Sequence, residues 1–244
     1  MDRVATQPDA PRVIATVGLH ASASTWVFNV VRELMIAAQG DSSVQALYAE
    51  EIAELPPATL AAEHLVIKSH HGSDALDAWL TSVDARLILS IRDPRDACVS
   101  MSQRFRAPLA RSVQWLTVDC NRMMRLAVAG QPLLRYEDRF FEKEESVRRL
   151  AGTLGLALES ARIATIAARY HTEAVRAFAT KLTELPGERL IEVASGHLAD
   201  RVTHIHTPHI GDARSGKWRG LPGPAQEELT RRFGPFLERF GYPR

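Results

Sequence analysis

Cysteine is scarce in this chain of 244 residues, which contains only Cys98 and Cys120. Two cysteines cannot form a disulfide framework or a four-thiolate metal site. Long apolar runs are lacking too, because no stretch reaches the roughly 20 residues that a membrane span requires. The first residues are polar and lack the apolar core of a signal peptide. These absences predict a cytoplasmic protein with no membrane partner.

An excess of charge of either sign is also absent, since 30 Lys and Arg residues face 29 Asp and Glu residues, for a net charge of +1. This balance argues against a nucleic-acid partner. Lysine is rare among the cations, with only Lys68, Lys143, Lys181 and Lys217. The many arginines suit phosphate because of their planar fork of donors, although a GC-rich gene gives the same bias. The apolar share of 45% and the charged share of 24% exclude a disordered or fibrous chain.

Short apolar segments alternate with segments of helical periodicity along the chain, which is typical of an α/β domain. No linker or internal repeat divides the sequence, so we expect one domain over 12–244, preceded by a flexible tail over 1–11. A central, mostly parallel sheet would be flanked by helices. The predicted strands are 12–18, 64–68, 85–91 and 132–136. The predicted helices are one that contains Val27–Ala38, a short one capped by Ser73, and 96–104, 111–129, 143–155, 159–168, 171–180 and 224–240, with an irregular region over 186–224.

Small and hydroxylated residues follow the first predicted strand, in the segment Gly18–Trp26. Small side chains let a backbone approach an anion, and the N–H groups at a helix start point toward it. A phosphate-binding P-loop has the form G-x-x-x-x-G-K-S/T, and here Ala23 and Ser24 replace its second Gly and its Lys. The missing Lys disfavours an ATPase or GTPase. Taken alone, the segment is equally typical of an ordinary capped turn between a strand and a helix.

A second polar segment follows the third predicted strand, at residues 92–100. Arg92 lies at the carboxyl end of that strand, where ligands bind in open α/β sheets. Ser100 lies on the helix that follows, so the charge of Arg92 and the hydroxyl of Ser100 together suit one phosphate. The alternative interpretation is that Arg92 pairs with Asp93 or Asp96 and merely caps the helix.

Four segments together resemble motifs of the sulfotransferases that use 3′-phosphoadenosine 5′-phosphosulfate (PAPS). Residues 20–26 are similar to the family's P-K-S-G-T-T-W, and residues 92–100 match R-n-P-k-D-v-x-v-S without a gap. Residues 136–138 are the family's Y-E-D, and 214–219 resemble a shorter form of R-K-G-x-x-G-D-W-K. The resemblance implies a sulfotransferase fold akin to that of the P-loop nucleotide kinases. It also implies PAPS as donor, adenosine 3′,5′-bisphosphate (PAP) as product, no metal, and a small-molecule acceptor with a hydroxyl.

The same resemblance assigns the nucleotide contacts. It implies that the first loop binds the 5′-phosphosulfate, that Arg92, Ser100 and Arg214 bind the 3′-phosphate, and that Tyr136 contacts the adenine. Trp26 either stacks near the adenine or belongs to the core. The residues implied as nucleotide-binding are Ala21, Ser22, Ala23, Ser24, Thr25, Trp26, Arg92, Ser100, Tyr136, Arg214, Ser215 and Gly216.

The segment Lys68-Ser69-His70 is similar to a Lys-Ser/Thr-His segment that carries the general base in this family. The resemblance implies that His70 takes the proton of the acceptor hydroxyl, a task suited to neutral imidazole near pH 7. The alternative is a hydrogen-bonded histidine at a strand end. Lys68 is expected to hold the sulfuryl group or the leaving phosphate, unless it is a surface residue. The family's loop Lys is Ala21 here, and His20 could replace it when protonated.

Two other functions remain open from the sequence. A nucleotide or adenylylsulfate kinase would need the P-loop Lys, which the loop lacks, and a carboxylate for magnesium. A non-catalytic protein that binds PAP or PAPS with the same fold is compatible with Ala21 in place of the catalytic Lys.

No motif identifies the acceptor or the oligomeric state. The family's acceptor pockets use variable loops, which correspond here to 41–63, 72–80, 104–112 and 186–212. The apolar residues of 41–63 would form a lid that favours a lipophilic alcohol or phenol. The His-rich segment 204–209 lines this pocket, or holds a metal, or does neither.

Overall fold

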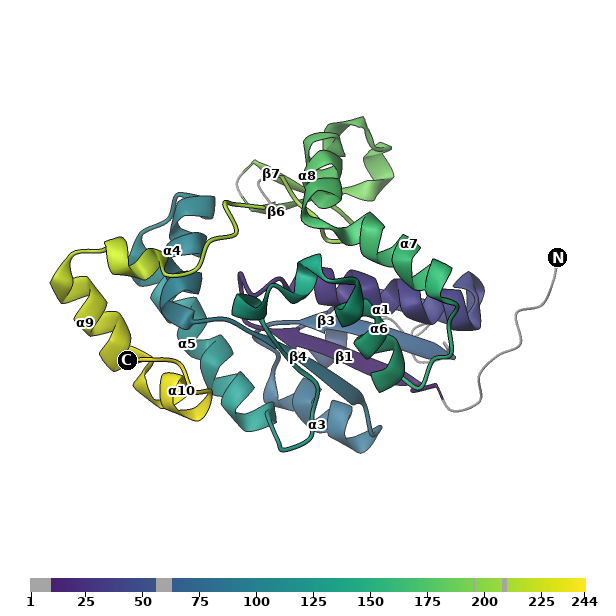
Figure 1. Cartoon of the computed structure of the whole chain (residues 1–244), viewed down its shortest axis with the longest axis horizontal. Coiled ribbons are helices and arrows are strands. Elements are labelled where there is room, and N and C mark those ends of the chain that lie inside the picture. Colours follow the sequence, from purple (N-terminus) through teal and green to yellow (C-terminus); the bar gives the residue numbers. More distant parts are fainter. Residues whose placement is uncertain (1–9, 56–62, 195, 208–209) are drawn as a thin grey trace.

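The computed structural model describes residues 10–55, 63–194, 196–207 and 210–244. A five-stranded parallel sheet forms its centre, in the order β2-β3-β1-β4-β5 (Figure 1). The predicted fold class, one α/β domain around a parallel sheet, is confirmed. Most of the tail predicted over 1–11 lies outside the described residues. The strands of this sheet are β1 (Val13–Gly18), β2 (Val44–Tyr48), β3 (His64–Ser69), β4 (Arg86–Ile91) and β5 (Leu133–Arg135).

Helices cover both faces of the sheet, because successive side chains of a strand point to opposite sides. The helices are α1 (Ser24–Gln39), α3 (Asp74–Ser82), α4 (Pro94–Phe105), α5 (Leu109–Leu126), α6 (Glu144–Thr153), α7 (Ser160–Tyr170), α8 (Thr172–Thr180), α9 (Gly223–Arg232) and α10 (Gly234–Arg239). Ile14 of β1 packs in a core with α1, α6 and α7, whereas Ala15 and Val17 pack with α3, α4, α5 and α10. Within the described ranges, no helix combines the length and the apolar character needed to span a membrane.

Short 3₁₀ turns connect these elements. They are η1 (Asp41–Ser43), η2 (Ile52–Glu54), η3 (Tyr136–Asp138), η4 (Phe140–Glu142), η5 (Leu182–Glu184), η6 (Gly187–Arg189) and η7 (Lys217–Gly220). The η3 turn follows β5 directly and carries the Y-E-D motif, so Tyr136 lies at the carboxyl edge of the sheet.

Two helices, α3 and α4, each begin with a capping side chain. Ser73 caps α3, as predicted, by accepting a hydrogen bond from Leu76 N at 3.2 Å. Asp93 caps α4 by accepting a bond from Arg95 N at 3.0 Å. Pro94 occupies the first turn, where its missing N–H would have no helical acceptor.

Three features differ from the sequence prediction. Val44–Tyr48, expected to belong to a lid, forms the edge strand β2, whose half-buried residues lack a strong alternating pattern. An antiparallel hairpin of β6 (Leu190–Ala194) and β7 (His197–Asp200) lies within the region expected to be irregular. The last predicted helix is divided into α9 and α10, because Pro235 lacks the N–H that would continue α9.

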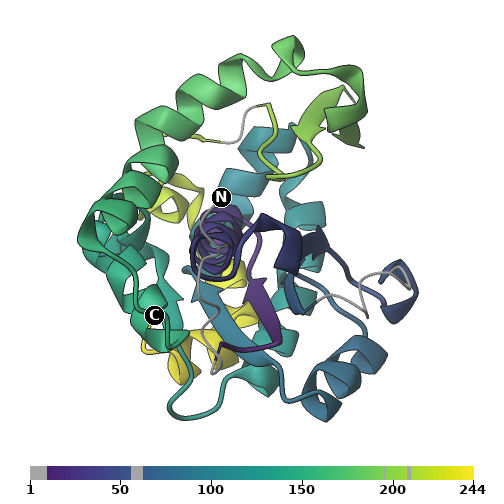
Figure 2. The same ribbon diagram turned by 90° about the vertical axis from the view of Figure 1, so that its right-hand side faces the viewer.

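The segment from α7 to β7, drawn in green, arches over one side of the sheet (Figure 2). A cavity at the carboxyl edge of the sheet is lined by three side chains of this segment, Tyr170, Thr172 and Val175, and by Ile205 and His206 just beyond β7. The arch therefore covers the position where a parallel sheet binds ligands.

Candidate functional site

The cavity lies where β1, β3 and β4 end and where α1 and α4 begin. The chain thereby brings together motifs that are far apart in the sequence. The predicted site residues that line it are His20, Ala21, Ala23, Ser24, Thr25, Trp26, Lys68, His70, Arg92 and Tyr136. Ser22, Ser100, Arg214, Ser215 and Gly216 are not among its lining residues.

The loop after β1 is tightly folded around its small residues. Gly18 permits this packing, because a Cβ at that position would collide with the side chain of Ser90. Ala21 and Ala23 have φ angles of 60° and 62°, in the left-handed region, which costs a residue with a Cβ about 1–2 kcal/mol. Since α1 begins directly after Ala23, its first N–H groups have no acceptor within the helix and suit an anion.

Two loop residues lie differently from their neighbours. Ser22 is fully buried and donates to the Leu19 carbonyl oxygen at 2.6 Å, so its hydroxyl stabilises the loop rather than facing the cavity. Trp26 is 8% exposed and packs edge-on against Phe140, with 5.3 Å between ring centroids. Trp26 therefore belongs to the core and also borders the cavity.

Arg92 reaches the cavity from the end of β4 and is 3% exposed. Its guanidinium lies 4.0 Å from the centre of the Tyr136 ring, a cation–π contact. It donates to the carbonyl oxygens of Ala21 at 3.1 Å and Arg214 at 2.8 Å. Arg92 thus joins the first loop, the Y-E-D motif and the C-terminal motif in one structure.

The nearby carboxylates are engaged elsewhere. Asp93 pairs with Arg95 at 2.7 Å, and Asp96 accepts the N–H of Gly216 at 2.5 Å. Arg92 pairs with neither of them, so the interpretation of Arg92 as a helix-capping partner is wrong. Its positive charge remains available to a ligand.

Four buried polar atoms in and beside the cavity have no hydrogen-bond partner. They are Arg92 Nε, Ser100 Oγ, Trp26 Nε1 and Asn29 Oδ1. Buried polar groups are normally hydrogen-bonded. These unpaired atoms are therefore available to hydrogen-bond a polar ligand. The two that the sequence assigns to a phosphate, Arg92 and Ser100, are among them, and the residues present therefore fit a phosphorylated nucleotide.

The side chain of Arg214 does not lie where the sequence predicts a phosphate ligand. It is 79% exposed and pairs with Asp212 at 3.1 Å. Ser215 is exposed as well. The segment contributes through its backbone instead, with the Arg214 carbonyl bound to Arg92 and the Gly216 N–H bound to Asp96.

His70 and Lys68 form a buried pair at the end of β3. His70 Nδ1 lies 2.5 Å from the Gly18 carbonyl oxygen. Because a carbonyl oxygen only accepts, Nδ1 carries the proton and Nε2 keeps its lone pair. Lys68 Nζ lies 3.3 Å from this Nε2. Lys68 is 6% exposed, so it is not the surface residue of the alternative interpretation.

The surroundings fix the charge of this pair. Burial, reinforced by His20 and Lys68, lowers the pKa of His70 well below its ordinary value, so the imidazole is neutral at neutral pH. Burial also lowers the pKa of Lys68 to about 8, although Glu50 opposes the shift. A neutral base and a cation that titrates close to neutrality thus face one cavity.

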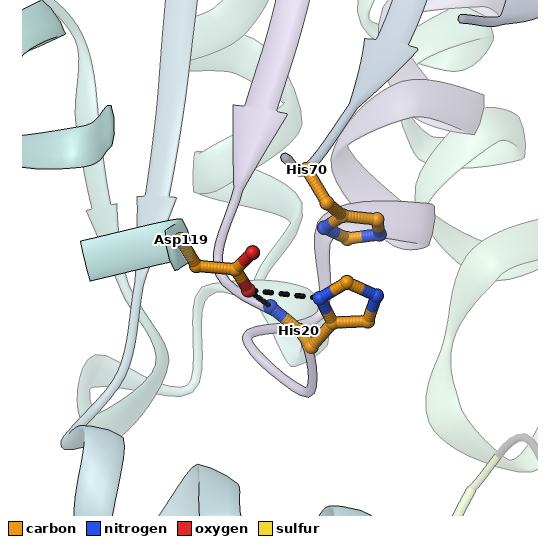
Figure 3. Close-up of side chains that lie close together, drawn as sticks. All are labelled: His20, His70 and Asp119. Carbon is orange, nitrogen blue, oxygen red and sulfur yellow. Dashed lines mark hydrogen bonds and ion pairs between the residues drawn. The ribbon is translucent and has the colours of Figure 1, made fainter. Parts of the chain in front are cut away.

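Asp119 of α5 is a functional residue that the motifs do not contain. Its Oδ2 accepts two bonds from His20, from Nδ1 and from the backbone N–H, both at 2.8 Å (Figure 3). The His20 ring stacks on His70, with 4.0 Å between centroids. On the other side, His71 Nδ1 lies 2.8 Å from Asp119 Oδ1. The sequence holds one signal for the burial of Asp119. It follows Leu116 by three residues, so its carboxylate falls on the buried face of the predicted helix.

Asp119 is charged despite its burial. Burial alone would raise the pKa of this carboxyl, but the charge of His20 and the hydrogen bonds of His20 and His71 hold it well below its usual range. The arrangement holds the His20 ring next to Ala21, which replaces the loop Lys of the motif that the segment resembles.

Glu50, beyond β2, fixes the chain around His70. Its carboxylate accepts the N–H groups of His70 at 2.9 Å and Gly72 at 2.6 Å and the hydroxyl of Ser69 at 2.7 Å. Tyr48 donates a further bond. Burial would raise the pKa of Glu50, but these bonds together lower it. Glu50 therefore holds the base in place without lining the cavity.

The His-rich segment 204–209 contributes Ile205 and His206 to the cavity lining. Burial, followed by the charge of Arg104, lowers the pKa of His206 to about 3. His204 is packed beside the rings of Phe28 and Tyr48. Residues 208–209 lie outside the described residues. Among the described histidines of the segment, His206 is thus the one that lines the cavity.

One group of potential metal ligands exists in the described part of the chain, formed by His20, His70 and Asp119, whose donor atoms lie within 4.8 Å of one another. Hydrogen bonds account for this proximity. His70 Nδ1 donates to Gly18, and Asp119 accepts from His20.

The cavity also has apolar lining residues, among them Met101 and Phe105 of α4, Val175 of the arch and Ile205. Of the lid predicted over 41–63, residues 41–55 are not among the lining residues, and 56–62 lie outside the described residues.

No protein-family model matches the chain, and no curated protein sequence matches it. Solved structures do match. Mouse sulfotransferase SULT7A1 complexed with PAP superposes with a TM-score of 0.61 and 13% identity over 95% of this chain and 86% of that one. Retinol dehydratase in a complex with retinol and PAP gives 0.58 and 14% over 94% and 82%. Retinol dehydratase with androsterone and inactive cofactor PAP gives 0.60 and 15% over 94% and 82%.

The chain therefore has the fold of the cytosolic-type sulfotransferases, as the motif resemblance implied. At 13–15% identity the comparison establishes the fold. The function is argued from the site residues described above.

Proposed function

We propose that this protein transfers a sulfuryl group from PAPS to the hydroxyl of a small-molecule acceptor. The observation that carries the proposal is the pairing of two features in one cavity. Arg92 and Ser100 keep unpartnered buried atoms where the motifs predict a phosphate. His70, directly after β3, has a neutral ring whose Nε2 carries a lone pair and lies beside Lys68.

The nucleotide would be held at its two anionic ends. The loop after β1 and the first N–H groups of α1 suit the 5′-phosphosulfate, while Arg92 and Ser100 suit the 3′-phosphate. Tyr136, which contacts the Arg92 guanidinium through its ring, would bind the adenine. When bound, PAPS supplies a sulfuryl group on a phosphate leaving group.

His70 is the general base of this proposal. Its Nε2 takes the proton that the acceptor hydroxyl loses as the oxygen attacks sulfur. The hydrogen bond from Nδ1 to Gly18 keeps the ring oriented for this step. Proton transfer to a positioned base contributes about 10²- to 10⁴-fold in rate.

Two side chains would stabilise the charge that develops on the leaving phosphate. Lys68 is one of them, because its Nζ lies beside His70 and the residue lines the cavity. His20 is the other, held in place by its contact with Asp119. His20 would thus take over the role of the loop Lys that Ala21 replaces.

Transfer of labelled sulfur from PAPS tests the proposal. The wild type is offered a panel of phenols, lipophilic alcohols and hydroxy acids, with and without a magnesium chelator. We expect product with at least one acceptor, no effect of the chelator, and a loss of about 10²- to 10⁴-fold in His70→Ala. Tight PAP binding with no turnover across the panel would favour the non-catalytic alternative, and chelator-sensitive phosphate transfer would favour a kinase.

A further inference from the structure

Arg104 is a cation that the nucleotide motifs do not include. It lies on α4 one turn after Ser100, so the two side chains share a face of the helix. Arg104 is partly buried and lines the cavity. Within the described ranges, its guanidinium has neither an acidic partner nor a hydrogen-bond acceptor.

The cavity offers this charge no counter-ion. Lys68, Arg92 and Arg104 all line it, whereas no Asp or Glu of the described residues does so. Burial, followed by the charge of Arg92, lowers the pKa of Arg104 to about 10, so the side chain is still cationic at neutral pH. A charge removed from water without a partner is costly. A ligand with an anionic group would relieve that cost.

The nucleotide already has partners for its anionic groups in Arg92, Ser100, Lys68 and the first loop. Arg104 has apolar neighbours on its own helix, because Met101 and Phe105 also line the cavity. The nearby His206 cannot supply a second charge there, since its pKa of about 3 keeps it neutral. Arg104 is therefore the cation of the acceptor side.

We propose that Arg104 binds an oxyanion on the acceptor, so that the preferred substrates are hydroxy acids with an apolar body. This inference rests on the proposed function, which requires an acceptor in that part of the cavity. A guanidinium binds a carboxylate through two parallel N–H bonds, which fixes orientation as well as affinity. The hydroxyl at the other end of the molecule would then face His70, across the apolar lining.

Calorimetric binding of matched pairs tests this assignment. The probes are 4-hydroxybenzoate, 3-(4-hydroxyphenyl)propionate and 12-hydroxydodecanoate, each against its methyl ester, titrated into the protein with and without PAP. At least one acid should bind the wild type 10- to 100-fold more tightly than its ester, as expected for a charge-assisted hydrogen bond of about 1.5–3 kcal/mol. The preference should shrink to less than threefold in Arg104→Gln. Arg106→Gln, which changes an exposed arginine just beyond the same helix, should retain the preference.

The possible failures are distinguishable. Acids that bind no better than their esters in every pair, or a preference that survives in Arg104→Gln, would overturn the inference. A more than tenfold loss of PAP affinity in Arg104→Gln would assign Arg104 to the nucleotide and would also overturn it. Absence of PAP binding in the wild type would contradict the proposed function instead, and the titrations without PAP would still report on Arg104. Equal melting temperatures of the two variants would show that both are folded.

Discussion

His20 and Asp119 are joined by two hydrogen bonds across 99 residues of sequence. The Nδ1 atom and the backbone N–H of His20 both lie 2.8 Å from the same carboxylate oxygen. The bond to the backbone fixes the loop, and the bond to Nδ1 orients the ring. The loop therefore holds an imidazole beside Ala21, where the motif resemblance would place a lysine.

Removing this imidazole should slow the chemical step. We expect His20→Ala to lower kcat about 10²-fold, by analogy with the loss of one stabilising donor. Lys at position 21 should recover part of the loss, so the double variant with Ala21→Lys should be faster than His20→Ala alone. A double variant no faster than His20→Ala, or a His20→Ala enzyme with wild-type kcat, would contradict the role given to His20.

The partner of His20 should matter through the position of the ring. Asp119→Asn keeps an acceptor for the His20 backbone N–H but replaces the charged acceptor of the ring Nδ1–H by a neutral one. We expect it to lower kcat by less than His20→Ala does, because the ring keeps a weaker hydrogen bond. A wild-type kcat in Asp119→Asn would contradict this role of Asp119.

The pH profile of the wild type follows from Lys68 and His70. The proposed mechanism requires Lys68 to be charged and His70 to be neutral. Since burial lowers the pKa of Lys68 to about 8, kcat should fall as the pH rises through that value. It should stay level at acid pH down to below 6.5, because the pKa of His70 lies well below that ordinary value. Lys68→Arg should move the alkaline limb upward, since a guanidinium keeps its charge. An alkaline limb unchanged in Lys68→Arg would exclude Lys68 as its origin.

The sheet and the nucleotide motifs could be predicted from the sequence because they are local. Strands such as 85–91 are mostly apolar, and Arg92 follows such a strand directly. Asp119 and Glu50 could not be found in this way, since their partners are 99 and 20 residues distant and no short pattern records them. The side chain of Arg214 could not be placed from the sequence for a related reason. Arg214 pairs with Asp212, two residues away, and the sequence does not show whether it binds this carboxylate or a phosphate.

The strain in the first loop should be measurable as stability. Ala23 has a φ of 62°, and relief of about 1–2 kcal/mol of strain outweighs the about 0.4–1 kcal/mol of added unfolded-state entropy that a glycine brings. Ala23→Gly should therefore raise the melting temperature by about 2 °C. Ala37→Gly, within α1, should lower it instead, because a glycine in a helix interior costs about 0.5–1 kcal/mol. A decrease in both variants would show that Ala23 is not strained.

Glu50 should make stability depend on acid pH. Its folded-state pKa is lowered below the ordinary 4.5, so its contribution is complete above that value and is lost as the pH falls through the folded pKa. Glu50→Gln should cost about 1–3 kcal/mol in urea unfolding at pH 7, with a smaller difference from the wild type at acid pH. The same difference at both pH values would rule out an electrostatic origin.

Calorimetric titration with PAP tests the nucleotide site most directly, with AMP and ATP as controls. We predict selective micromolar binding of PAP. Arg92→Ala should lower the affinity for PAP about 10- to 100-fold, which corresponds to the free energy of a hydrogen bond from a charged group. AMP, which lacks the 3′-phosphate, should bind both proteins weakly and alike. Equal affinities for PAP and AMP in the wild type would contradict the 3′-phosphate site at Arg92 and Ser100 and, with it, the proposed sulfotransferase activity.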